Sequence, residues 1–182
     1  MAKSKFFTTR KITTVGLLTA LIAALHITIG YIPTSFLAQI TIMHIPVILG
    51  AILEGPAAGG VLGLFFGLSS LIFALTTGNP MSVFFMNPLV SVVPRILIGV
   101  VSYYIYKAVK LRNGQLRAGI AAAAGTLTNT LLVFLAVYLL FFREYSALVT
   151  ALGGACLVNV GPEVAVSVII CVPIVMISKR KA

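Results

Sequence analysis

The chain has 182 residues, of which 60% are hydrophobic and 9% are charged, and its mean hydropathy is +1.14. A soluble domain of this length could not hide so much apolar surface behind so few charges, so we expect lipid to be the solvent for most of the chain. The net charge of +10 rests on 13 Lys and Arg residues against three carboxylates, so the placement of these cations has to be explained.

Six apolar runs are predicted to be membrane-spanning helices, for which about 20 mainly apolar residues are needed. In chain order they lie at about 11–32, at 36–53, from the turn Glu54-Gly55-Pro56 to 77, and at 88–110, 116–142 and 151–178. No Pro-rich, Ser-rich or charged linker divides them. The sequence therefore predicts an all-α integral membrane protein, with residues 1–182 forming a single domain that is one bundle of six transmembrane helices.

The basic residues indicate how such a bundle is oriented. Six spans place both ends of the chain on one side of the membrane, and 11 of the 13 Lys and Arg residues fall on that side. These are Lys3, Lys5, Arg10, Lys11, Lys107, Lys110, Arg112, Arg117, Lys179, Arg180 and Lys181. The positive-inside rule makes this side, and with it both termini, cytoplasmic. Orientation and contact with anionic lipid then explain the net charge, and we expect no nucleic-acid partner.

One cation, Arg95, falls inside the fourth predicted helix, about two turns below the outer surface, where a charge is costly unless it faces the bundle interior or water and has a partner. Asn87, Ser91 and Arg95 follow one another at four-residue steps and therefore share one helix face. Asn87 directly precedes Pro88, a pattern that fits a helix N-cap as well as a ligand. Pro94 removes a helical hydrogen bond, which predicts a kink beside the arginine.

Further polar residues lie in the fifth and sixth predicted helices. Asn129 is near the middle of the fifth, and Asn159 and Glu163 share one face of the sixth. One interpretation is a ligand site that contains these residues and Arg95. The other is a structural ion pair between Arg95 and Glu163, with the asparagines bonding across helices. The two are compatible, because such a pair can open toward a ligand carboxylate.

Stripes of small residues at four-residue spacing predict close helix packing in two places. The stripes are Gly59, Gly63 and Gly67 in the third predicted helix and Gly16, Ala20 and Ala24 in the first. We expect the third-helix stripe to pack within the bundle, whereas the first-helix stripe can also receive another chain. His26 and His44 are single and are expected to be core or interfacial residues.

Enzyme signatures are missing from the sequence. The three carboxylates are too scattered to bind a metal, and there is no Walker phosphate loop, no H-E-x-x-H and no G-x-S-x-G. We therefore expect no catalytic residue, no metal and no cofactor, and any ATP hydrolysis would have to come from a partner.

Three segments resemble the substrate-binding S components of energy-coupling factor (ECF) vitamin transporters, which are six-helix membrane proteins of about this length. Ala20-Leu-Ile-Ala-Ala24 matches their A-x-x-x-A pattern. Residues 44–70, HIPVILGAILEGPAAGGVLGLFFGLSS, look like their second-to-third helix hairpin. Residues 87–100, NPLVSVVPRILIGV, are similar to their fourth-helix segment, in which a Pro-Arg pair is often followed by glycine. Together with size and topology, the similarity covers essentially the whole chain.

This resemblance implies a high-affinity vitamin receptor in a bacterial cell membrane, completed by a transmembrane coupling subunit and two ATPase subunits. Helices four to six and the loops after helices one and three would enclose the vitamin, which makes Pro33–Gln39 and Gly78–Met86 candidate lids. The implied substrate-binding residues are Arg95, Asn87, Ser91, Asn129, Asn159, Glu163 and Gln39. The implied docking stripe for the coupling subunit is Gly16, Ala20 and Ala24.

Pantothenate is the substrate that fits these residues best. One intramembrane cation beside amide and hydroxyl groups suits a small anion that carries an amide and hydroxyls, and the segment around Arg95 also looks most like the pantothenate-specific members. The absence of Trp weakens the stacking expected for a flat pterin or flavin. Folate, biotin, cobalamin and riboflavin stay open as substrates, as does a membrane assembly protein with no tight small ligand and no ATPase partner.

Overall fold

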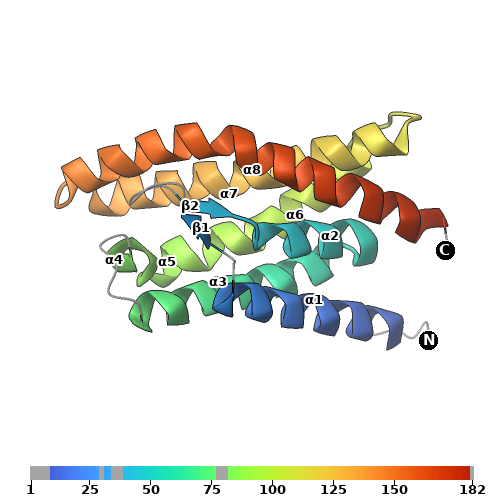
Figure 1. Cartoon of the computed structure of the whole chain (residues 1–182), viewed down its shortest axis with the longest axis horizontal. Helices are drawn as coiled ribbons and strands as arrows, with labels where there is room; N and C mark the ends of the chain where they lie inside the picture. Colours follow the sequence, from blue (N-terminus) through green and yellow to red (C-terminus); the bar gives the residue numbers. More distant parts are fainter. Residues whose placement is uncertain (1–8, 29–30, 34–38, 77–81, 181–182) are drawn as a thin grey trace, which may run out of the picture.

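The computed structural model describes residues 9–28, 31–33, 39–76 and 82–180, except for the side chains of residues 31–33, 39, 40, 179 and 180. Its elements are, in chain order, α1 (Thr9–Ile27), β1 (Tyr31–Pro33), β2 (Gln39–Thr41), α2 (His44–Glu54), α3 (Pro56–Thr76), α4 (Ser82–Phe85), α5 (Pro88–Ser91), α6 (Val93–Ala108), α7 (Gly114–Phe141) and α8 (Ser146–Arg180). The long helices lie side by side along the bundle, and α1 begins at the end where α8 finishes (Figure 1).

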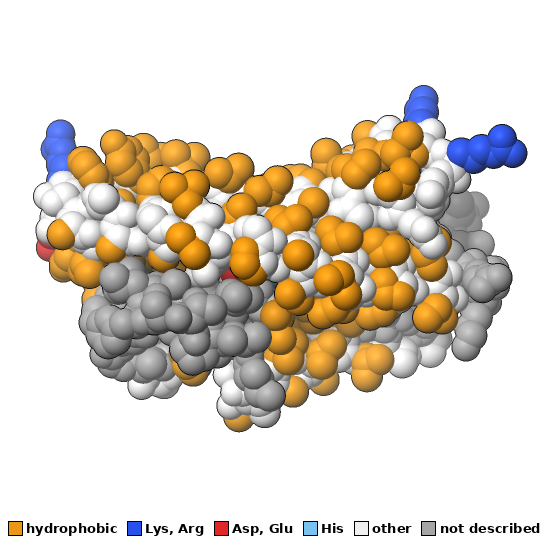
Figure 2. Space-filling model, turned by 45° about the horizontal axis from the view of Figure 1, so that its top comes forward, with side chains coloured by type: hydrophobic (Ala, Val, Ile, Leu, Met, Phe, Trp, Pro, Cys, Tyr) orange, Lys and Arg blue, Asp and Glu red, His pale blue; other side chains and the backbone are white. Residues whose placement is uncertain are grey.

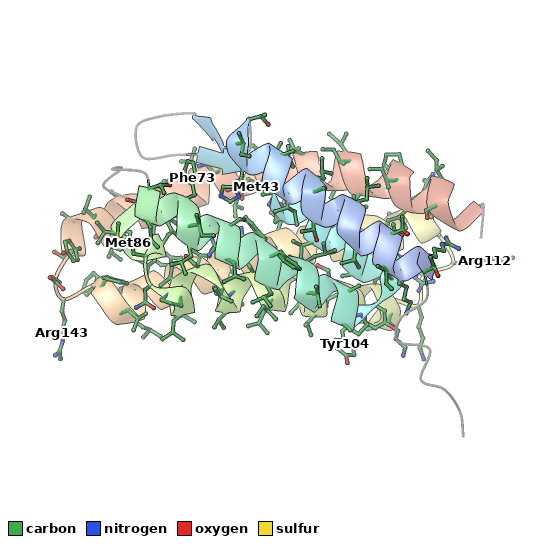
Figure 3. All side chains as sticks on the ribbon, turned by 90° about the horizontal axis from the view of Figure 1, so that it is seen from below. Met43, Phe73, Met86, Tyr104, Arg112 and Arg143 are labelled. Carbon is green, nitrogen blue, oxygen red and sulfur yellow. The ribbon has the colours of Figure 1, made fainter. Side chains whose placement is uncertain are left out.

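Five helical stretches of the described chain are long and apolar enough to cross a membrane. They are Thr9–Ile27, Pro56–Thr76, Pro88–Ala108, Gly114–Phe141 and Ser146–Ser178. Apolar side chains cover the length of the face in Figure 2, and Lys and Arg side chains project only at its two ends. Arg112 and Arg143 mark opposite ends of the bundle in Figure 3, with Arg112 at the end where α1 begins.

The length predicted for the second spanning helix is wrong. The structure places strand β2 where that helix was expected to begin, and α2 has only 11 residues. Nine of these, the run from His44 to Ile52, are buried. A short helix that is apolar on all sides is stabilised by a surrounding protein core, and α2 lies between α1, α3, α6, α7 and α8. Such a core helix and a membrane span give the same apolar run in a sequence.

The boundaries of two other predicted helices also need correction. The first helix was expected to continue to residue 32, but α1 ends at Ile27 and β1 follows from Tyr31 to Pro33. β1 pairs with β2 in antiparallel register, with Tyr31 opposite Thr41 and Pro33 opposite Gln39. The β-branched and aromatic residues around this point favour strand over helix. The last helix begins at Ser146, five residues before its predicted start at 151.

Of the two candidate lids, the first lies largely outside the described residues. The second was expected to be a loop, but its described part contains the single-turn helix α4. Phe84 of α4 is fully buried, and its ring packs edge-on against Phe141 and Tyr145 at the α7–α8 connection. This aromatic contact explains why the segment is ordered into a helical turn there.

The glycine stripe of α3 packs against the helix that carries Arg95, which confirms the prediction of close packing within the bundle. A Cβ atom on Gly59 would lie 3.0 Å from the Cα of Gly99, and one on Gly63 would overlap the carbonyl group of Arg95. A Cβ atom on Gly67 would lie 2.7 Å from the Cα of Val92. Because no side chain separates the backbones, α3 fixes the depth and rotation of Arg95 directly.

Replacing Gly63 by alanine is expected to lower the free energy of unfolding by about 1–3 kcal/mol, because the methyl group must displace the α6 backbone. Thermal unfolding of the purified protein in detergent would show this as a lower midpoint. Gly60→Ala is the matched control, since its Cβ would meet nothing closer than Ile96 at 4.0 Å. The control should be neutral or slightly stabilising, and equal midpoints for the two variants would contradict the close α3–α6 packing.

Candidate functional site

Seven of the buried polar side chains, carried by five neighbouring helices, are here called the polar cluster. They are His44, Ser91, Arg95, Thr126, Asn129, Asn159 and Glu163. α2 contributes the histidine, α5 and α6 the serine and arginine, α7 the threonine and Asn129, and α8 the other two. Five of the seven were predicted as site residues, whereas His44 was expected only to be a core or interfacial residue, and its complete burial confirms that expectation.

Arg95 is the cation of the polar cluster, and only 5% of it is exposed. Its guanidinium lies between two aromatic rings, 5.5 Å from the centre of Phe66 and 5.1 Å from that of Phe85. Both distances are within the range in which a cation is attracted to a ring face. The side chain of Arg95 is therefore held in one place by α3 on one side and α4 on the other.

Pro94 explains a further contact of this arginine. Proline has no amide hydrogen, so the carbonyl of Val90, four residues earlier, loses its ordinary helical donor. The Nη1 group of Arg95 donates to that carbonyl instead. The regular helix is interrupted at Val92, between α5 and α6, next to the proline at which a kink was expected.

The other two predicted residues of this helix face are engaged in local structure. The Oδ1 atom of Asn87 accepts the amide of Leu89 at 3.0 Å and caps α5, so only its NH₂ group remains for a ligand. The hydroxyl of Ser91 donates to the carbonyl of Phe85. This bond ties α5 to α4, and thus to the ring that stacks on Arg95. Both residues support the position of the arginine.

Glu163 does not pair with Arg95 as expected. Among the described residues its partner is Thr41, which donates its backbone amide at 2.8 Å and its hydroxyl at 3.2 Å to the same oxygen, Oε1. The hydroxyl of Thr130 on α7 lies beside the same carboxyl group. The interpretation as a structural Arg95–Glu163 ion pair is therefore wrong, because the carboxylate binds strand β2.

His44 lies between the α6 and α7 residues of the polar cluster. Its Nε2 atom lies 3.0 Å from the hydroxyl of Thr126, which also donates to the carbonyl of Ala122. Arg95 is close enough to interact electrostatically with His44. The sequence signal for His44 was present, since it is a polar residue at the start of an apolar run, but spacing alone did not connect it to α7.

Asn129 carries a polar atom that the described residues do not satisfy. Its Oδ1 atom is buried and has no hydrogen-bond partner there. Leaving a buried acceptor unpaired costs about 1–3 kcal/mol, which a donor on a bound molecule would recover. Asn159 is also buried and lies one turn before Glu163 on α8. The side chain of Gln39 lies outside the described residues, although its backbone belongs to β2.

The small-residue stripe of α1 faces away from the bundle. Gly16, Ala20 and Ala24 are all exposed, and a Cβ atom on Gly16 would meet nothing within 4 Å. The residues that α1 buries are Ile22 and His26. The stripe is therefore smooth and uncovered in the described part of the chain.

Comparison with known proteins gives one family and two named relatives. The sequence model of the family "ECF transporter, substrate-specific component" matches residues 10–178. The pantothenic acid transporter PanT of Lactococcus lactis subsp. cremoris (strain MG1363) is 36% identical over 150 residues, which cover 74% of this chain and 75% of that protein. The pantothenate transporter PanT of Leuconostoc mesenteroides subsp. mesenteroides is 40% identical over 77 residues, 40% of this chain and 38% of that protein. The family match includes every residue of the polar cluster.

Proposed function

We infer that this chain, which belongs to the family of ECF transporter substrate-specific components, is the pantothenate-binding subunit of such a transporter. As a transport subunit it binds its substrate and is not an enzyme. Its apolar helices agree with a multi-pass membrane protein. Two relatives named as transporters of pantothenic acid or pantothenate support the choice of substrate.

The observation that carries the proposal is the buried guanidinium of Arg95. Its two aromatic neighbours and the Val90 carbonyl hold this guanidinium in place inside the protein, where a cation is uncommon and often functional. A substrate carboxylate would bind it by a charge-assisted hydrogen bond. The sequence has few carboxylates, and the one on α8, Glu163, accepts its hydrogen bonds from Thr41.

The remaining groups of pantothenate match the neutral members of the polar cluster. The molecule has one carboxylate, one amide and two hydroxyls. Asn129 offers an unsatisfied buried acceptor for a hydroxyl or an amide N–H, and Asn159 and the NH₂ group of Asn87 are further hydrogen-bonding groups. We propose Arg95, Asn129 and Asn159 as direct ligands, with Asn87 and Ser91 at the edge of the site and Gln39 of β2 as a further candidate.

We also propose that the chain crosses a bacterial cell membrane six times, with β2 and the buried α2 together forming the short second crossing. Both termini would then be cytoplasmic. The cations at the start of α1 and around the α6–α7 connection support this orientation, because they lie at the bundle end opposite Arg143 (Figure 3). The exposed α1 stripe would bind a transmembrane coupling subunit, and two partner ATPase subunits would supply the energy.

Calorimetric titration of the purified protein with a panel of vitamins tests the function. We expect saturable, tight binding of pantothenate and none of folate, biotin, cobalamin or riboflavin at the same concentration. Tight binding of another vitamin would replace the substrate and keep the family. A folded sample that binds none of them would favour a membrane assembly role.

A further inference from the structure

Glu163 poses a problem for an anionic substrate, because a second carboxylate near the site should repel it. The structure shows what occupies this carboxyl group. Only 6% of Glu163 is exposed, and its Oε1 atom accepts two hydrogen bonds from Thr41, 122 residues away in the chain. Both lone pairs of Oε1 are thus engaged by the protein, which gives this oxygen a structural partner that does not depend on a substrate.

Thr41 occupies a point that controls the geometry of the polar cluster. It ends β2, and α2 begins three residues later with His44, whose ring lies against Thr126 on α7. The residue before α2, Met43, provides no side-chain cap. The entry of the chain into α2 therefore depends on contacts from outside the helix, and the two hydrogen bonds to Glu163 are such contacts.

We propose that Glu163 is a positioning residue that fixes the β2–α2 junction, and with it His44, against α7 and α8 at the substrate site. It neither binds the substrate nor pairs with Arg95. Glu163 then acts through an oxygen that accepts hydrogen bonds from Thr41, and its negative charge has no role of its own. This explains why an acidic residue is tolerated here. The link to substrate rests on the proposed function, whereas the link to Thr41 does not.

The first test needs no substrate. Hydrogen–deuterium exchange of the purified protein should show faster exchange in the peptide that contains Thr41 when Glu163 is replaced by leucine, because the amide loses its acceptor. Glu163→Gln keeps an oxygen that accepts from the same amide, so most of the protection should remain. Glu144→Leu is the matched control, since this carboxylate is exposed in the α7–α8 connection. Unchanged exchange in Glu163→Leu would overturn the proposal.

The second test measures how fast pantothenate dissociates. Glu163→Leu should accelerate dissociation by on the order of tenfold or more, whereas Glu163→Gln should stay near the wild-type rate. Thr41→Val removes only the hydrogen bond from the hydroxyl and should by itself accelerate dissociation by roughly threefold. In a protein that already carries Glu163→Leu, the same change should have no further effect on the rate. This loss of effect in the double variant is the signature of positioning through Thr41.

Different outcomes separate this inference from the proposed function. A wild-type protein that binds no pantothenate contradicts the function, and the exchange measurement then still decides the role of Glu163. If wild type binds but Glu163→Gln loses affinity as strongly as Glu163→Leu, the charge matters and the positioning role is wrong. If Glu163→Leu does not fold, Glu163→Gln and Thr41→Val carry the test. Thr41→Val should accelerate dissociation and Glu163→Gln should not, so an unchanged rate in Thr41→Val would overturn the positioning role.

Discussion

Arg95→Gln is expected to weaken pantothenate binding by about 2–5 kcal/mol, which is roughly 30- to several-thousand-fold in Kd. The reason is the position of the side chain, which is buried between Phe66 and Phe85 where water cannot replace it as a partner for a carboxylate. Glutamine keeps hydrogen-bonding capacity but no charge. Arg95→Lys should recover only part of the affinity, because an ammonium group lacks the planar fork and stacks less well between the rings.

A substrate analogue makes this prediction specific to the carboxylate. Pantothenol carries an alcohol in place of the carboxylate and keeps the amide and both hydroxyls. It should bind the wild-type protein much more weakly than pantothenate, and Arg95→Gln should change its affinity little. Calorimetry with both compounds on both proteins gives the coupling energy between the two groups. Equal losses for pantothenate and pantothenol would mean that Arg95 supports the fold of the site without binding the carboxylate.

Features that depend on local spacing could be predicted from the sequence. In any helix, a proline leaves the carbonyl four residues before it without the usual amide donor. A kink beside Arg95 can therefore be expected from the sequence of that helix alone. The four-residue spacing of Gly59, Gly63 and Gly67 likewise defines a groove on one helix face without reference to a partner. The close packing of the glycine stripe is confirmed, and the helix is interrupted beside Pro94; the packing holds the backbone of Arg95 against α3.

Features that depend on distant contacts could not be predicted in the same way. The strand β2 has only three residues, and its last one is held by a side chain 122 residues away. α2 has the composition of a spanning helix but is short and fully surrounded. The Arg95–Glu163 pair was expected because two opposite charges are rare in an apolar chain and often pair. In the structure, the backbone amide of Thr41, which is distant in sequence, donates to the carboxylate instead.

Ala20→Trp is expected to reduce pantothenate uptake by the assembled transporter while leaving pantothenate binding and thermal stability unchanged. Ala20 is exposed on α1, in the middle of the smooth stripe with Gly16 and Ala24, so an indole there meets no part of the bundle. At a closely packed helix interface the same group would cost about 1–3 kcal/mol or more, which weakens docking of the coupling subunit roughly 5- to 150-fold.

The measurement that separates docking from substrate binding compares uptake in cells with calorimetry on the purified variant. Ile169→Trp is the matched control, because Ile169 on α8 is 70% exposed and lies outside the α1 stripe. It should leave uptake, binding and stability near wild type. If Ala20→Trp and Ile169→Trp reduced uptake equally, lipid-facing bulk in general would be the cause. Small residues on the α1 stripe allow a second helix to approach closely, which is the reason for expecting the coupling subunit there. If neither variant reduced uptake, the coupling subunit would have to bind another face.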